Sequence, residues 1–175
     1  MAATRLDFKL KGAGWANLEI VSAETTTIVE AISYCTDALD DLVRIGINIA
    51  TDKGIGGAIF NHEPALSAVV GETSWIEDNN WVSGARLSVI RDLQSWIEPS
   101  FHWRAAVDAD FVIDVGSRDE MARLFLEMAL RVRAEHGEDG YEELWAGRLR
   151  YPRRAVAALE AALNCAAGSS YNYGA

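Results

Sequence analysis

Three runs of alternating hydrophobic and polar residues at the start of the chain constrain the fold most. In residues 5–11 every second side chain is apolar, and residues 16–20 repeat this pattern. Residues 25–34 read TTTIVEAISY, a run rich in the β-branched residues that favour strands. Short turn signals, such as Gly12-Ala13-Gly14, separate the runs. Because short turns join antiparallel neighbours, this part of the sequence predicts an antiparallel meander.

Two segments change to the helical period. The first segment, residues 37–52, begins at Thr36-Asp37, and either of these side chains can cap a helix. Its apolar arc is broad enough for burial on more than one side. Residues 118–135 follow Ser117, and Glu120 completes a capping box. We therefore expect helices over both segments.

The C-terminal third predicts two further helices. Gly137 can end the preceding helix, and Asp139 opens a short helical segment that contains Tyr141 and Trp145. Pro152 is well placed at the start of the final helix, which carries an apolar stripe.

Between the first two helices, residues 57–116 return to short strand-like runs. We expect strands over five segments: residues 57–62, 65–71, 81–90, 101–107 and 110–115. The element order is therefore βββ-α-βββββ-αα, which is typical of an α+β fold rather than of βαβ units. We expect one mostly antiparallel sheet of about seven to eight strands, with the helices packed on one face.

Length and composition predict a single domain with its own core. The chain has 175 residues, of which 50% are hydrophobic, so a disordered chain is excluded. We expect one α+β domain over residues 1–165 and a flexible C-terminal tail over residues 166–175. The formal net charge of −10 argues against nucleic-acid binding and suits a basic protein partner.

The N-terminal residues and the cysteines favour a cytoplasmic protein. Charged residues interrupt residues 5–11, so no signal peptide is expected, and no apolar run is long enough to span a membrane. Cys35 and Cys165 are far apart in the sequence. We interpret them as two small buried thiols in a reducing compartment, with a disulfide or a catalytic thiol as the less favoured alternatives.

No motif identifies a catalytic or cofactor site. The histidines His62, His102 and His136 stand in no metal-ligand spacing, and the sequence has no G-x-S-x-G, P-loop or G-x-G-x-x-G motif. Clustered carboxylates could act as acid and base in a hydrolase, but solvated turns and helix starts explain most of them. We therefore expect no cofactor, no metal and no catalytic residue.

Four arginines cluster in residues 148–154, in a chain whose charge is otherwise acidic. Residues 148–175 carry four basic and one acidic residue, a net charge of +3. The cluster could bind phosphate or an acidic partner. The favoured interpretation is that it neutralises the acids of the neighbouring EDGYEE run.

Three short motifs carry a resemblance to a known family. They are Gly14-Trp15-Ala16, the run SYCTDALDDL over residues 33–42, and the run GYEELW over residues 140–145. Together they resemble a family of uncharacterised bacterial proteins of similar length. The resemblance implies no activity, so no catalytic residue follows from it.

Six tryptophans are many for this length, and they suggest a surface for a partner. Trp75, Trp81 and Trp96 flank predicted turns, and Glu77 and Asp78 lie beside them. Core or rim packing of the tryptophans is the favoured interpretation. The alternative is that these five residues form a partner-binding surface, and they are the candidates for one.

The sequence as a whole predicts a non-enzymatic, acidic, protein-binding domain. An immunity-type inhibitor of a basic bacterial toxin would have this charge and this lack of catalytic motifs. The alternative is a small-molecule-binding or hydrolytic domain with a pocket between sheet and helices.

Overall fold

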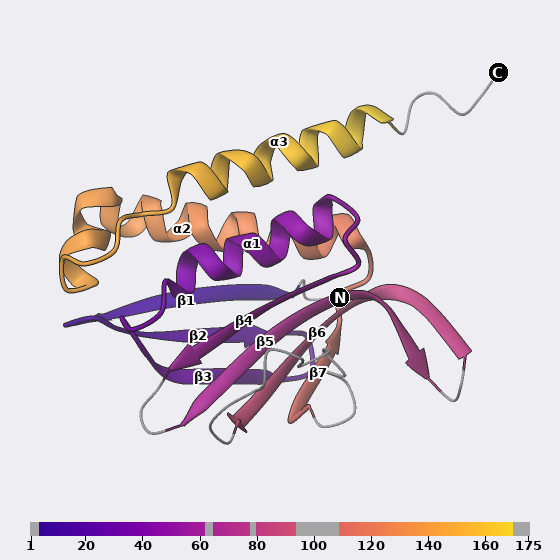
Figure 1. Ribbon diagram of the computed structural model, residues 1–175, viewed down its shortest axis with the longest axis horizontal. Helices are drawn as coiled ribbons and strands as arrows, with labels where there is room; N and C mark the ends of the chain where they lie inside the picture. The colour runs from indigo at the N-terminus through magenta and orange to yellow at the C-terminus, as the bar shows by residue number, and fades with distance from the viewer. Residues whose placement is uncertain (1–3, 62–64, 78–79, 94–108, 170–175) are drawn as a thin grey trace.

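In the part of the chain that the structure describes, seven antiparallel strands and three helices form an α+β fold, the class that the sequence predicted (Figure 1). This computed structural model describes residues 4–61, 65–77, 80–93 and 109–169. The expected strand at residues 101–107 lies outside these ranges. The other expected strands and helices are all present within them.

The predicted meander is confirmed. It consists of β1 (Arg5–Gly12), β2 (Trp15–Val21) and β3 (Thr26–Ser33), which pair antiparallel in the order β1-β2-β3. Ala13 and Gly14 join β1 to β2 with φ of 52° and 81°, the positive values that a tight two-residue hairpin loop requires. Side chains such as Leu6 and Leu18 alternate into the core and are fully buried.

The remaining strands form a second sheet, so a single sheet of seven to eight strands is not confirmed. Strands β4 (Ile55–Asn61), β5 (Leu66–Glu77), β6 (Asn80–Leu93) and β7 (Phe111–Asp114) pair antiparallel in chain order. At the junction of the sheets, the Arg91 guanidinium of β6 donates to Thr27 Oγ1 and to the carbonyl oxygen of Ile28 on β3. A side chain therefore contacts the edge of β3 where a continuous sheet would place another strand.

The helices lie on one side of the sheets. α1 (Ala38–Ala50) packs on β4 and β5, and α2 (Arg118–Leu144) packs on β1 and β6. The two helices contact each other, and α3 (Arg153–Ser169) packs on both of them (Figure 1). The capping box of Ser117 and Glu120 is present. Gly137 adopts φ 67° and ψ 177°, so it breaks α2 where the sequence predicted the helix to end.

Three local expectations need correction. α3 continues to Ser169, so residues 166–169, which we assigned to a flexible tail, are helical, and residues 170–175 lie outside the described ranges. Asp37 occupies the N-cap position of α1, but its side chain makes no capping hydrogen bond. Cys35 and Cys165 are exposed rather than buried: Cys35 lies in the turn between β3 and α1, and Cys165 lies near the C-terminal end of α3.

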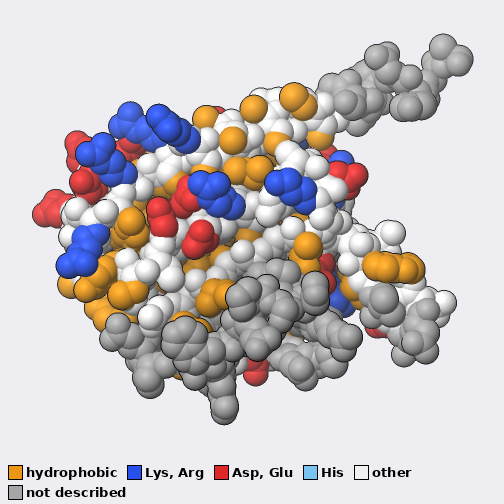
Figure 2. Space-filling model, viewed as in Figure 1, with side chains coloured by type: hydrophobic (Ala, Val, Ile, Leu, Met, Phe, Trp, Pro, Cys, Tyr) orange, Lys and Arg blue, Asp and Glu red, His pale blue; other side chains and the backbone are white. Residues whose placement is uncertain are grey.

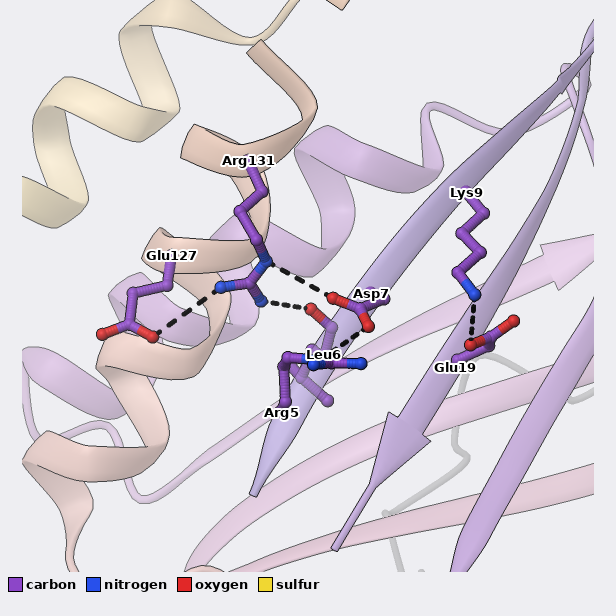
Figure 3. Close-up of polar contacts among 7 residues, drawn as sticks. All are labelled: Arg5, Leu6, Asp7, Lys9, Glu19, Glu127 and Arg131. Carbon is purple, nitrogen blue, oxygen red and sulfur yellow. Dashed lines mark hydrogen bonds and ion pairs between the residues drawn. The ribbon is translucent and has the colours of Figure 1, made fainter. Parts of the chain in front are cut away.

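The core fills the space between the helices and the sheets. α1 is buried on more than one side, as predicted, and Gly46 allows its close approach to Phe125 of α2 and Leu159 of α3. Arg131 of α2 donates through Nη2 to the Leu6 carbonyl oxygen at 2.7 Å, and its Nε lies 3.3 Å from Asp7 Oδ1 (Figure 3). These contacts fix α2 against β1. In the described part of the chain, no helix combines the length and apolar character needed to cross a bilayer.

Candidate functional site

The β5–β6 hairpin extends beyond the rest of the second sheet. Strand β4 pairs with β5 only as far as Glu72, and β7 pairs with β6 over Arg86–Val89. Beyond these points β5 and β6 continue as a two-stranded ribbon to the Glu77–Asn80 pair. We call residues 74–77 and 80–84 the hairpin end, which projects past the helices in Figure 1.

A buried ion pair anchors the hairpin end to the sheet. Arg86 Nε donates to Glu72 Oε2 at 2.9 Å, and only 10% of the arginine and 8% of the carboxylate side chain are exposed. The Arg86 guanidinium also lies 4.4 Å from the centre of the Trp75 ring, within the range of a cation–π interaction. The Arg86 guanidinium therefore contacts both the buried carboxylate at the base of the ribbon and the ring of Trp75, the first tryptophan of the hairpin.

Trp75 is half-buried by residues of its own hairpin. A Cβ atom on Gly84 would lie 2.8 Å from the Trp75 ring, so the glycine makes room for the indole. The Trp75 Nε1 donates to Glu77 Oε2 at 3.4 Å. The ring thus stiffens the ribbon, and only part of it faces solvent.

Trp81 is the most exposed large hydrophobic residue that the structure describes, with 75% of its surface accessible. Trp81 is paired with Ile76, whereas Trp75 is paired with Val82, and this second pair lies one position further from the turn. Because neighbouring positions alternate between the two faces of a ribbon, the tryptophans point to opposite faces. The structure thus brings Trp75, Glu77 and Trp81 onto one hairpin, while Asp78 and Trp96 lie outside the described residues.

A second polar cluster lies at the other end of the molecule, where the three short sequence motifs meet. Gly14 N donates to the Leu144 carbonyl oxygen at 2.9 Å, and Tyr34 N donates to the Gly14 carbonyl oxygen at 2.8 Å. The Arg148 guanidinium lies 4.8 Å from the centre of the Tyr34 ring. We call this region the motif junction. Its residues were singled out as motifs, but nothing in the sequence indicated that they would meet.

The motif junction contains buried polar atoms without a hydrogen-bond partner among the described residues: Asp37 Oδ1, Tyr141 Oη and Trp145 Nε1. The side chains of Tyr141 and Trp145 are fully buried and stack on each other, with ring centres 6.1 Å apart. Burial, and next the charge of Asp40, raise the pKa of Asp37 to about 6. Burial also raises the pKa of Tyr141, and the charges of Asp37 and Asp40 add to this shift.

Replacing Asp37 with asparagine is expected to stabilise the protein at pH 7 to 8. A folded-state pKa raised above the ordinary 3.8 means that Asp37 favours the folded state at low pH, and that this contribution is lost as the pH rises through about 6. We expect a gain of about 1–2 kcal/mol at pH 8, reduced from the full shift because the carboxyl group is partly exposed. Urea unfolding at pH 4 and pH 8 measures the difference.

The matched control for this prediction is Asp139→Asn, at an exposed carboxylate on the last turns of α2. It should change the free energy of unfolding by less than about 0.5 kcal/mol, because an exposed side chain makes few folded-state contacts. If the free energies of unfolding of wild type and Asp37→Asn differ by the same amount at pH 4 and pH 8, the pKa of Asp37 is not raised in the folded protein.

Two arginines of the cluster at residues 148–154 pair with acids of the chain. Arg153 pairs with Glu138, and Arg150 Nε lies 4.0 Å from Glu142 Oε2, which agrees with the interpretation that the arginine cluster neutralises nearby acids. Basic and acidic side chains are interspersed around α1 and the α2–α3 connection on the face in Figure 2. Residues 4–61, 65–77, 80–93 and 109–169 contain no group of three side chains suited to hold a metal ion.

Grooves on the surface do not coincide with the buried polar atoms. Their volumes are about 640 to 760 Å³, and neither Asp37, Tyr141 nor Trp145 contributes to their linings. Comparison with protein-family models, with curated proteins and with solved structures found no match. The resemblance to an uncharacterised bacterial family stays a prediction.

Proposed function

We propose that this chain is a protein-binding domain that uses the hairpin end as its contact surface. The observation that supports this most is the 75% exposure of Trp81 on a ribbon that projects from the body. Tryptophan is enriched among the residues that dominate binding energy in protein interfaces, because it buries a large area with few rotatable bonds. A soluble domain gains no stability from an indole held in water.

The rigidity of the hairpin end supports the same proposal. A binding surface that is already ordered loses less conformational entropy on association. Arg86, Glu72 and Trp75 hold the ribbon at its base, and Gly84 leaves room for the Trp75 ring. In this proposal Trp75 supports the surface and Trp81 contacts the partner.

We further propose a basic partner. The net charge of −10 speeds the approach of a basic protein at low salt, although the Debye length of about 8 Å at physiological salt limits the effect to short range. An immunity-type inhibitor of a basic toxin is the narrower form of this proposal. The gene beside the one that encodes this chain is the first partner to test, because an immunity gene is expected to adjoin its toxin gene.

Trp81→Ala is expected to weaken partner binding at least about tenfold, mainly through faster dissociation. Its effect on the free energy of unfolding should stay within about 0.5 kcal/mol, because an exposed side chain makes few folded-state contacts. Glu77→Lys should instead slow association, and more so at low salt. Surface kinetics at two salt concentrations separate the two rates.

A further inference from the structure

A groove of about 700 Å³ runs along the outer edge of β3. Its described lining consists of six consecutive residues of this strand, Thr26–Ala31, together with Ser67 of β5 and Arg91 of β6. Side chains of successive residues in a strand point to opposite faces. A lining that includes every residue of the run therefore includes the backbone edge of β3 itself.

The contact from Arg91 shows which backbone groups point into the groove. Arg91 Nη2 donates to the Ile28 carbonyl oxygen at 3.2 Å, so this carbonyl points away from β2. In an antiparallel pair, the N–H and C=O of one residue lie on the same side of the strand, and the side alternates along the chain. Thr26 and Ile28 therefore direct both groups outward, while Thr27 directs them toward Ile20 of β2.

This edge of β3 pairs with no strand in the described part of the chain. The strand order of the first sheet ends at β3, and the Arg91 side chain donates to the outward carbonyl oxygen of Ile28. An unpaired row of N–H and C=O groups is a template for another extended chain. The groove thus has the chemistry of a β-strand acceptor.

Arg91 favours a negatively charged group on a ligand of the groove. Its described contacts to Thr27 and Ile28 use a single nitrogen, Nη2, although a guanidinium has five N–H donors. It is the basic residue among those that line the groove. An arginine beside an open strand edge can bind a carboxylate through its remaining donors. Glu30, two residues after Ile28, is exposed and also lines the groove.

We propose that this groove binds an extended segment of a partner polypeptide, which pairs with the outer edge of β3 and places a carboxylate against Arg91. Main-chain hydrogen bonds to Thr26 and Ile28 hold the segment, and Arg91 selects an acidic residue at one position. The site is separate from the hairpin end, and it does not depend on the function proposed above.

A proline at position 28 tests the strand pairing directly. Ile28→Pro removes an outward N–H while leaving the inward bonds of Thr27 to β2 in place, and proline is tolerated on edge strands for this reason. Random short peptides displayed on phage are selected on the wild-type protein. The best peptide is then synthesised with its acidic residue intact and with that residue changed to the corresponding amide.

We expect Ile28→Pro to weaken binding of the acidic peptide about tenfold or more, while the far-ultraviolet circular dichroism spectrum of the protein stays unchanged. Arg91→Gln should remove the preference for the acidic over the amide peptide, and this readout holds even if Ile28→Pro fails to fold. Selection that yields no peptide, peptides that bind wild type and Ile28→Pro equally, or an acid preference that survives Arg91→Gln would each overturn the proposal. Concentration-dependent dimerisation that Ile28→Pro abolishes would also overturn it, because the occupant would then be a second copy of this chain.

Discussion

Arg86→Met is expected to destabilise the protein by about 3–5 kcal/mol, the largest effect of any substitution considered. The change leaves the Glu72 carboxylate buried without its partner, and an unpaired buried charge costs far more than an intact pair contributes. Trp75 also loses the cation that lies on its ring. Urea unfolding of wild type and variant at neutral pH and moderate salt measures the difference.

Two controls separate this explanation from a general loss of packing. The double variant Glu72→Gln, Arg86→Met should recover a large part of the lost stability, because no buried charge remains. Arg44→Met breaks the exposed pair with Asp40 and should cost less than about 1 kcal/mol. If Arg86→Met also costs less than about 1 kcal/mol, the ion pair does not hold the base of the hairpin.

Gly14→Ala is expected to cost about 2–4 kcal/mol, through two separate effects. The backbone at Gly14 has φ of 81°, which an alanine adopts only with strain of about 1–2 kcal/mol. The new Cβ would also lie 2.4 Å from Tyr34 Cδ1, so the tyrosine ring must move. Because Gly14 hydrogen-bonds both Tyr34 and Leu144, this movement affects the whole motif junction.

Gly147→Ala is the matched control. Gly147 also has a positive φ, of 62°, but a Cβ there would meet nothing within 4 Å. It should therefore cost only the backbone strain, about 1–2 kcal/mol. Thermal unfolding of the two variants measures the steric part by difference, and equal costs would show that the contact with Tyr34 is not restrictive.

The sequence predicted those features of the fold that depend on neighbouring residues. Alternation identified β1 and β2, and the serine and glutamate at 117 and 120 identified the start of α2, because both signals arise from local geometry. The division into two sheets depends on which strand lies beside β3. Alternation shows which side of a strand is buried, but it does not show its neighbour, so the role of Arg91 was not predictable.

The sequence predicted the region of the candidate site, but it did not predict which tryptophan is covered and which is exposed. Trp75 and Trp81 both flank a turn in the sequence, and nothing local distinguishes them. Only the register of the hairpin shows that they face opposite sides, and only the position of Arg86 shows that Trp75 is covered. The convergence of Gly14, Tyr34 and Leu144 likewise depends on contacts between distant segments.

The most direct test of the proposed protein-binding function compares Trp81→Ala with Val112→Ala. Val112 is also an exposed hydrophobic residue, with 46% of its surface accessible, but it lies on β7, outside the hairpin end. The measurement is the dissociation rate of the protein encoded by the adjacent gene from each immobilised variant. We predict that Trp81→Ala dissociates at least about tenfold faster than wild type, while Val112→Ala does not differ from it. Binding that is absent in the wild type, or that both variants retain equally, would contradict a partner surface at the hairpin end.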